Sequence, residues 1–406
     1  MPSKSISVSY AAAVFDQREI DAVVDVLKNP KKIVAGEAVK EFEKEIAKLF
    51  GKNYGVMVNS GSSANLLSLE VLDIPSGSEV ITPVLTFSTT VAPIIQKGLV
   101  PVFADTEPGT YLIDYEQIEP LITEKTRALM IPSLIGNIPD LDLLRKLADD
   151  HNLWLIEDSA DTLGGMYRDK PTGNLTDIST TSFYASHIIT AAGGGGMICF
   201  HDENLSQRAL ILSNWGRDST LFGIHEASED IEKRFKGSVA GSSYDAKFIF
   251  SQLGYNMQCT ELEAAFGLVQ LSRLEEFSKI RKSNFKNLID FFEKYEQFFI
   301  LPKQLDEVET NWLAFPLVVK EASPFSREEL VRHLEEYHIQ TRPIFSGNIL
   351  RQPAFSHIKH RSLPDGYPVA DSVMLGSIMI GCHHGLKKDH LNHVEEVFDD
   401  FLGKYC

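Results

Sequence analysis

The chain has 406 residues, of which 43% are hydrophobic and 23% charged, so it is long enough for two domains that bury a large core. Its formal net charge of −17 argues against nucleic acid as a partner, because a phosphate backbone requires a basic face. The first residues lack the apolar core of a leader, and no apolar run reaches the ~18 residues of a membrane helix. We therefore expect a cytoplasmic enzyme that has no membrane partner.

The first half of the chain alternates helical and strand patterns. Apolar residues at helical spacing predict helices at residues 11–27 and 39–50, the second ended by Gly51. Strands separated by helices such as 140–150 predict a mostly parallel, covered sheet, with a ligand at the carboxyl ends of the strands. Apolar runs place these strands at residues 54–58, 79–84, 100–105, 128–133 and 153–157.

A small polar turn, Asn59-Ser-Gly-Ser-Ser-Ala-Asn65, follows the first strand, and a helix is expected to resume at residues 66–72. A strand, a polar turn and a helix start together offer free N–H groups and the positive end of the helix dipole, which suits an anion. The alternative is that Ser60 or Ser62 only caps the helix. Further along, residues 85–90 lead into another helix, and an aromatic such as Phe87 belongs more often to a core than to a cofactor site.

Residues 156–196 contain the strongest functional pattern. Asp158 ends an apolar strand, Ser182 and His187 follow on a second turn, and glycines occupy residues 193–196. An acid to pair a ring nitrogen, a hydroxyl for a phosphate and glycines for close backbone approach are the parts that hold a phosphorylated aromatic cofactor. His187 is then left for proton transfer. The alternatives are that Asp158 is a turn residue or a helix cap and that His187 is a structural histidine.

The second half predicts a smaller α/β domain. The polar run at residues 219–246 is too long for an ordinary loop and is expected to be a lid or an interface. A long amphipathic helix from Leu268 through Ile280 should cross between domains 1–270 and 271–406. A strand at 312–319 and a helix at 327–337 follow.

These motifs resemble the sugar aminotransferase family of pyridoxal-phosphate fold type I. That family's pattern is Glu-Asp, Ser-Phe, a lysine five residues after that serine, and a Gly-Glu-Gly-Gly turn. Here His187 stands in place of the lysine, as in the branch of nucleotide-diphospho-4-keto-6-deoxyhexose 3-dehydratases, and Gly193 replaces the turn glutamate. The resemblance implies a large domain with a mostly parallel seven-stranded sheet and a smaller C-terminal α/β domain.

The exchange of lysine for histidine has a direct chemical consequence. A lysine amine condenses with an aldehyde to form a Schiff base, whereas an imidazole does not. With His187 the cofactor, pyridoxal phosphate or its amine form pyridoxamine phosphate, would not be tethered. An imidazole remains able to take and give a proton at neutral pH.

The resemblance also implies the roles of individual residues. His187 and Asp158 are the expected catalytic residues, and the expected homodimer follows from Asn256, which would reach the phosphate of the neighbouring subunit's cofactor. The remaining roles are phosphate binding for Ser62, Ser63 and Ser182, ring stacking for Phe87, an acid of the dehydratase branch for Asp161, and sugar-nucleotide contact for Arg342, Asn348 and Arg351.

The implied activity is removal of the 3-hydroxyl from a CDP- or GDP-linked 4-keto-6-deoxyhexose, for dideoxysugar and lipopolysaccharide synthesis. Members that act on CDP-linked sugars hold a two-iron cluster on cysteines just after a Trp-Gly-Arg-Asp step. Here Ser219 follows Trp215-Gly-Arg-Asp218, and a Cys-ligated cluster needs four nearby thiolates. We expect no iron–sulfur cluster and no other metal, reduced thiols, and L-glutamate as the amine donor. The four cysteines are scattered at Cys199, Cys259, Cys382 and Cys406.

Two other functions remain open. One is an aminotransferase that uses a lysine from elsewhere in the chain, such as Lys170 or Lys247. The other is a sugar-nucleotide-binding protein that has lost catalysis along with the lysine and the turn glutamate.

Overall fold

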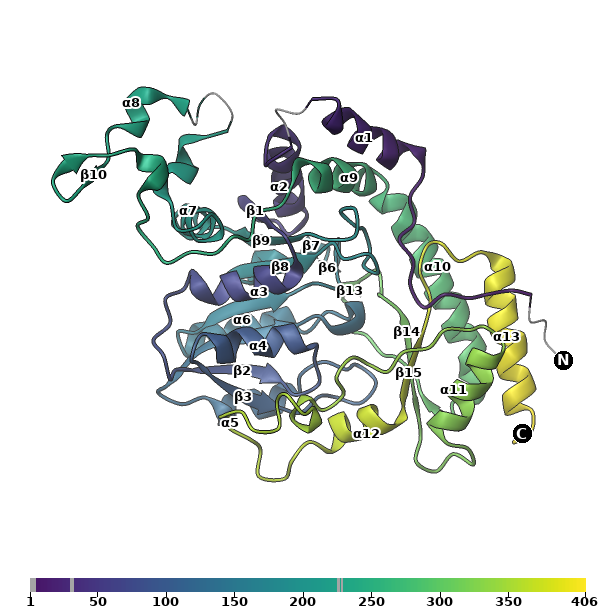
Figure 1. The fold of residues 1–406 in the computed structure, drawn as a ribbon. Coiled ribbons are helices and arrows are strands. Elements are labelled where there is room, and N and C mark those ends of the chain that lie inside the picture. Colours follow the sequence, from purple (N-terminus) through teal and green to yellow (C-terminus); the bar gives the residue numbers. More distant parts are fainter. Residues whose placement is uncertain (1–4, 30–32, 225–226, 228) are drawn as a thin grey trace.

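A computed structural model describes residues 5–29, 33–224, 227 and 229–406. Its large domain is built on a seven-stranded sheet of order β1-β9-β8-β5-β4-β2-β3 (Figure 1). Only β9 runs antiparallel to its neighbours, so the predicted mostly parallel sheet is confirmed. The strands are β1 (Tyr54–Val58), β2 (Glu79–Pro83), β3 (Val100–Ala104), β4 (Thr126–Pro132), β5 (Trp154–Asp158), β8 (Ile178–Ser182) and β9 (Gly196–Phe200).

Both faces of this sheet are covered because successive strand residues point to opposite sides. Met130 and Ile156 belong to one hydrophobic cluster, while their chain neighbours Leu129 and Leu155 belong to another on the opposite face. The helices that follow the strands are α3 (Gly61–Glu70), α4 (Ser88–Gln96), α5 (Ile118–Leu121), α6 (Leu141–Asp150) and α7 (Glu203–Ser213).

The helix expected to resume at residue 66 starts five residues earlier, at Gly61. Most of the polar turn is therefore helical. The reason is that Ser60 caps the helix by accepting a hydrogen bond from the N–H of Ser63 at 3.1 Å. The capping alternative is therefore confirmed for Ser60.

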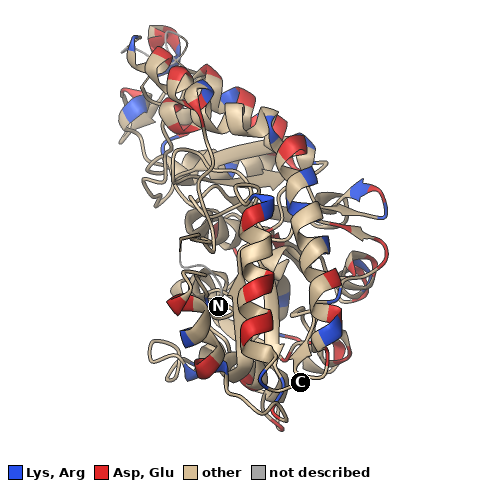
Figure 2. Ribbon diagram, turned by 90° about the vertical axis from the view of Figure 1, so that its right-hand side faces the viewer, with Lys and Arg blue, Asp and Glu red and all other residues tan. Residues whose placement is uncertain are grey.

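The small domain contains a three-stranded antiparallel sheet with helices packed on it. Its core is aromatic: the ring centroids of Phe292 and Phe398 are 4.8 Å apart, and those of Phe292 and Phe315 are 5.4 Å apart. Figure 2 views this side of the molecule and shows acidic positions along the helix that ends at the C-terminus. The elements are α10 (Leu274–Phe292), β12 (Phe299–Ile300), β14 (Phe315–Val319), α11 (Arg327–Glu336), α12 (Pro368–Gly376), β15 (Ser377–Ile380) and α13 (Lys388–Leu402).

The N-terminal segment connects the two domains. Val8 pairs with the strand-like residues of the small domain, since its N–H donates to His338 O and its carbonyl accepts from the N–H of Gln340, both at 2.9 Å. The chain then crosses to α1 (Gln17–Leu27), which packs on α9 (Glu261–Ser272) of the large domain. The expected boundary at residues 270 and 271 falls in the last turn of α9, where we propose that the domains divide.

The prediction of one continuous helix from Leu268 through Ile280 is wrong. It consists of α9 and α10, which are separated at Arg273. Ion pairs to Glu19 at 2.9 Å and to Asp16 at 3.3 Å hold Arg273 against the start of α1. Periodicity did not show this break because both helices continue the apolar pattern.

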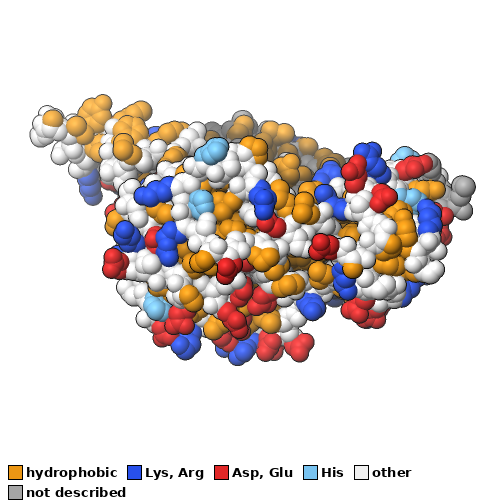
Figure 3. Space-filling view, turned by 90° about the horizontal axis from the view of Figure 1, so that it is seen from below, with side chains coloured by type: hydrophobic (Ala, Val, Ile, Leu, Met, Phe, Trp, Pro, Cys, Tyr) orange, Lys and Arg blue, Asp and Glu red, His pale blue; other side chains and the backbone are white. Residues whose placement is uncertain are grey.

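An arm projects from the large domain beyond α7 (Figure 1), and its described part comprises residues 215–224, 227 and 229–255. It carries much exposed hydrophobic surface, which Figure 3 shows as the orange projecting end at the left of the molecule. Leu253 is 98% exposed and Phe248 is 60% exposed. The arm includes α8 (Ile231–Arg234), β10 (Ser238–Val239) and β11 (Ser242–Ser243).

Three short strands and one helix complete the fold. Within the described residues, none of the helices combines the length and the apolar character needed to span a bilayer. The remaining elements are α2 (Glu37–Leu49), β6 (Met166–Tyr167), β7 (Lys170–Pro171) and β13 (Val308–Glu309).

The start of α2 is capped by a residue that is distant in the sequence. Gly36 precedes the helix and has no side chain to cap it, whereas the buried carboxylate of Glu261 on α9 accepts three backbone hydrogen bonds there. They come from the N–H groups of Gly36, Ala38 and Val39 at 2.7, 2.7 and 3.2 Å. The negative charge also suits the positive end of the helix dipole.

Glu261→Gln should lower the free energy of unfolding by about 1–3 kcal/mol, because charge-assisted hydrogen bonds to a helix start are lost. Urea unfolding followed by circular dichroism measures this change. The control is Glu37→Gln, an exposed acid in the first turn of the same helix, which should change the free energy by less than about 0.5 kcal/mol. Equal effects of the two substitutions would contradict the capping role.

Candidate active site

A cavity of about 330 Å³ lies where β5, β8 and the start of α3 meet. Asp158 is the last residue of β5 and Ser182 the last of β8, so the parallel strands bring both to one edge of the sheet. The cavity is lined by six of the residues expected from the sequence, Ser62, Phe87, Asp158, Asp161, Ser182 and His187.

Asp158 is buried and is held by three donors. The side chains of Asn65 and Thr90 each donate to its Oδ2 at 2.8 Å, and the N–H of Ala160 donates to Oδ1 at 3.3 Å. Burial raises the pKa of this carboxyl, while the hydrogen bonds oppose that rise. Among the described residues no cation pairs with it in a salt bridge, so a protonated ring nitrogen would suit the carboxylate.

Asn65 and Thr90 were not singled out from the sequence. Asn65 links Asp158 to β8, because it also accepts a hydrogen bond from the hydroxyl of Thr180 at 2.6 Å. Asn65 belongs to the polar turn noted above, but its contact spans 93 residues of sequence and no local pattern indicates it.

His187 has one ring nitrogen fixed and the other free. Its Nδ1 lies 2.6 Å from the carbonyl oxygen of Ala160, which can only accept, so Nδ1 carries the hydrogen. Nε2 then has a lone pair and no hydrogen-bond partner within the described ranges. Burial, together with the positive charge of Arg281, lowers the pKa of His187 to about 4, although the hydrogen bond to Ala160 opposes this shift. At neutral pH the imidazole is therefore an uncharged base.

Asp161 faces the same imidazole. Its Oδ1 lies 3.7 Å from His187 Nδ1, and its Oδ2 accepts a hydrogen bond from the N–H of Ile135 at 3.0 Å. Burial raises the pKa of Asp161 to about 7, and the nearby Asp158 adds to this rise. The floor of the cavity therefore carries less negative charge than its two carboxyls suggest.

The start of α3 and Ser182 form the opposite wall. Ser62 and Ser182 line the cavity, whereas the hydroxyl of Ser63 donates to Asn59 at 2.7 Å and does not line it. Gly61 is required here, because a Cβ at this position would lie 2.5 Å from the Cβ of Ser182. A helix start with two hydroxyls suits a phosphate group.

A wider hollow of about 670 Å³ adjoins the cavity and shares Tyr10, Phe87 and Phe345 with it. Phe87 is half exposed at this mouth, with its ring centroid 5.8 Å from that of Phe345. Arg342 lines the hollow and lies over the ring of Tyr10 at 5.8 Å. Tyr10 comes from the N-terminal segment and was missed in the sequence, where nothing local marks it.

Three other expected residues lie outside both hollows. Asn348 donates to Asp371 on α12 at 2.7 Å, and Arg351 forms an ion pair with the same carboxylate. Asn256 is exposed and pairs through its backbone with Asn214, next to the arm.

The lysines considered for an aminotransferase also lie elsewhere. Lys170 is exposed on β7, and Lys247 forms an ion pair with Glu229 on the arm. In the part of the chain that the structure describes, no lysine lines either hollow. Gly193, which replaces the family's glutamate, has φ +97°, a backbone conformation that a glutamate would adopt only with strain.

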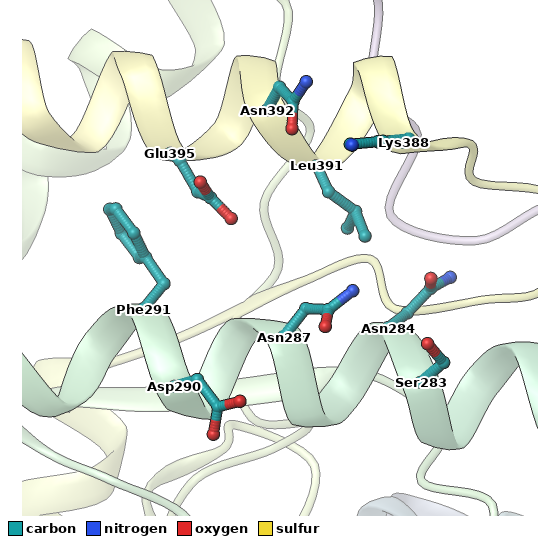
Figure 4. Close-up of a pocket in the computed structure, with 9 residues that line it drawn as sticks. All are labelled: Ser283, Asn284, Asn287, Asp290, Phe291, Lys388, Leu391, Asn392 and Glu395. Atoms are coloured by element: carbon teal, nitrogen blue, oxygen red, sulfur yellow. The ribbon is translucent and has the colours of Figure 1, made fainter.

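A separate polar groove of about 590 Å³ lies between α10 and α13, and Figure 4 shows side chains from both helices pointing into it. It contains none of the expected site residues. Its lining consists of Ser283, Asn284, Asn287, Asp290, Phe291, Lys388, Leu391, Asn392 and Glu395.

A phosphorylated pyridine ring fits the main cavity by its donor set. Asp158 would meet the ring nitrogen, Ser62 and Ser182 at the start of α3 would meet the phosphate, and Phe87 would lie against the ring. His187 would be the base, since it lines the same cavity and its Nε2 has no hydrogen-bond partner among the described residues.

Comparison with known proteins agrees with this geometry. The DegT/DnrJ/EryC1/StrS aminotransferase family matches residues 14–399. The lipopolysaccharide biosynthesis protein RfbH of Salmonella typhimurium is 39% identical over 91% of this chain and 86% of its own length. A dTDP-4-dehydro-2,6-dideoxy-D-glucose 3-dehydratase of Saccharopolyspora spinosa is 35% identical over 98% of this chain and 87% of its own.

A solved structure extends the likeness to the whole fold. GDP-4-keto-6-deoxymannose-3-dehydratase with a trapped PLP-glutamate geminal diamine matches with a TM-score of 0.86 at 28% identity, covering 96% of this chain and 99% of that one. The likeness therefore confirms the expected pyridoxal-phosphate fold type I.

His187 should remain neutral from pH 8 down to about 5 and take up a proton near its pKa of about 4. The C2 proton of its imidazole, followed by NMR and assigned by its absence in His187→Asn, reports this titration. Because an unfolded histidine titrates near ~6.5, this group destabilises the fold as the pH falls below that value. The substituted protein should therefore lose less stability than the wild type between pH 7 and 5, and a midpoint above pH 6 would contradict the assignment.

Proposed function

This chain belongs to the DegT/DnrJ/EryC1/StrS aminotransferase family, and we propose that it is a nucleotide-sugar 3-dehydratase that works with pyridoxamine 5′-phosphate. Its substrate would be a CDP- or GDP-linked 4-keto-6-deoxyhexose on the route to a 3,6-dideoxysugar. One observation carries the proposal: His187 stands in the cavity where a tethering lysine would be needed for transamination.

The cavity residues would hold the cofactor and tune it. When bound, pyridoxamine phosphate supplies an amine for the 4-ketone and a ring that accepts electrons as its methylene carbon loses a proton. Asp158 would keep the ring nitrogen protonated, with Asn65 and Thr90 holding the carboxylate in place. Ser62, Ser182 and the start of α3 would bind the phosphate.

His187 would carry the proton. Its Nε2 is an unprotonated nitrogen at neutral pH and is therefore able to take the proton from the methylene carbon. The imidazolium that results would give the proton to the departing 3-hydroxyl oxygen, so that this group leaves as water. Burial favours the second step, because it makes the charged ring a stronger acid.

The adjoining hollow would take the rest of the sugar nucleotide. It combines the rings of Tyr10, Phe87 and Phe345 with the cation of Arg342, a set that suits a base and a diphosphate. Contacts from Asn348 and Arg351 would require their bonds to Asp371 to open first.

We propose L-glutamate as the source of the amine. The neighbouring structure that contains a PLP-glutamate adduct belongs to a 3-dehydratase, which supports this choice. The thiols of this chain are dispersed, with Cys199 on β9 and Cys382 in the small domain, whereas a two-iron cluster needs four together. The scattered thiols therefore favour regeneration of the cofactor amine from glutamate over reduction through an iron–sulfur cluster.

We further propose that the protein is a homodimer assembled in part through its arm. The arm exposes Leu253, Phe250 and Phe248 to solvent, and hydrophobic surface of this extent on a projecting segment is typical of an interface. The exposed side chain of Asn256 next to it would then reach the partner's cofactor phosphate.

After addition of pyridoxal phosphate, glutamate should convert the aldehyde spectrum to that of the amine, and borohydride should leave no cofactor bound to the protein. The amine form should then dehydrate a 4-keto-6-deoxyhexose linked to GDP or CDP, as measured by mass spectrometry. His187→Asn should lower this rate by about 100-fold or more.

His187→Lys is the matched variant, because it restores a primary amine at the same position. It should become fixed to the cofactor by borohydride and lose dehydration. Fixation in the wild type would point to an aminotransferase with a hidden lysine, and binding of sugar nucleotide without any turnover would favour a non-catalytic binding protein.

Leu253→Glu should weaken the dimer by at least about tenfold, because it places a charge in an apolar contact. Sedimentation or light scattering over a concentration series measures this change. The control is Leu375→Glu on α12, which also alters an exposed leucine but lies far from the arm in the sequence and the fold. A monomeric wild type would refute the proposed assembly.

A further inference from the structure

Arg281 on α10 is a buried cation that forms no ion pair with any acid in the described part of the chain. It is 1% exposed, and the titratable groups that act on it are the thiol of Cys382 and the phenol of Tyr10, both uncharged at neutral pH because burial raises their pKa values. Burial lowers its pKa to about 10, so it stays charged at neutral pH. Burying a charge of this kind costs free energy unless its N–H groups form hydrogen bonds.

Its guanidinium joins the two domains at the back of His187. It donates to the carbonyl of His187 at 3.5 Å, to those of Trp312 and Leu313 at 3.1 and 3.2 Å, and to His384 Nδ1 at 3.2 Å. The rigid fork of arginine is suited to such a bridge, because it offers several donors in one plane.

These contacts close a circuit around His187. From Leu313, which Arg281 holds, the N–H donates to Ile135 O at 2.7 Å, and the N–H of Ile135 donates to Asp161. Asp161 in turn faces the imidazole Nδ1. The circuit therefore consists of hydrogen bonds from the backbone carbonyl of His187 as far as Asp161, and its last step, from Asp161 to the imidazole, is a 3.7 Å approach rather than a hydrogen bond.

Ile135 in this circuit is strained. Its φ of +59° places a β-branched residue in the left-handed region, which costs on the order of 1–3 kcal/mol. Such a conformation persists only where the surroundings hold it in place, and here the two backbone hydrogen bonds of Ile135 are those of the circuit.

We propose that Arg281 is a positioning residue for His187, which fixes the imidazole through this circuit and places a permanent positive charge behind it. The catalytic benefit of this arrangement rests on the proposed function. A nearby cation disfavours the imidazolium, so a proton taken by His187 is more readily passed on to the leaving oxygen.

Other titratable groups lie around His187. Asp158 and Asp161 face it from the end of β5, Tyr184 lies in its own loop with ring centroids 6.3 Å apart, and Tyr10 faces it from the N-terminal segment. The positive charge of Arg281 contributes to the lowered pKa of His187. Its removal is therefore expected to shift the titration in one direction, upward.

The test is the NMR titration of His187 in the full-length protein without cofactor, which does not depend on the proposed reaction. Arg281→Gln should raise the midpoint by on the order of one pH unit. Arg281→Lys keeps the charge but replaces the fork by a single ammonium, so the midpoint should stay within about 0.3 unit of the wild type. In turnover assays both variants should lower kcat about tenfold or more and change KM for the sugar nucleotide less than about threefold.

Arg273→Gln is the matched control, because it removes a largely buried guanidinium that pairs with Glu19 at the break between α9 and α10. It should lower the melting temperature without moving the titration of His187. A folded Arg281→Gln whose midpoint and kcat equal those of the wild type would overturn the proposal. If that variant does not fold, a wild-type kcat in Arg281→Lys would overturn it equally. A shifted midpoint in a protein that dehydrates no sugar would instead refute the proposed function and leave the positioning role intact.

Discussion

The site depends on one buried carboxylate held by neutral donors. Asp158 ends β5, and its Oδ2 accepts from Asn65 on α3 and Thr90 on α4, while Asn65 also accepts from Thr180 on β8. One acid therefore fixes two helices and two strands around the cavity. Because no side-chain cation neutralises it among the described residues, the carboxylate remains available to a positively charged group in the cavity.

Burial acts on the three titratable groups of the floor in a consistent way. It raises the pKa values of Asp158 and Asp161 and lowers that of His187. Each shift favours the uncharged form, so the cavity holds an imidazole base beside acids of reduced charge. This distribution of protons supports the proposed role of His187, in which the imidazole first accepts a proton and then releases it.

The junction between the domains contributes as much as the sheet edge. Tyr10 arrives from the N-terminal segment, Leu313 and Arg342 come from the small domain, and Arg281 connects that domain to the backbone of His187. A movement of the small domain would thus alter the hollow beside the cavity and the contacts of His187 together. The family likeness extends over residues 14–399, which includes both sides of this junction.

The sequence by itself determined the fold class, the mostly parallel sheet and the central pair of Asp158 and His187, because periodicity and short motifs are local properties of the chain. It also indicated Ser62, Phe87 and Ser182 through the resemblance. Only the tertiary structure decided that Asn65 and Tyr10 line the cavity, that Arg281 contacts the backbone of His187, and that Asn348 and Arg351 are engaged by Asp371. Each of these contacts joins residues far apart in sequence, and burial, which sets the pKa of His187, exists only once the chain has folded.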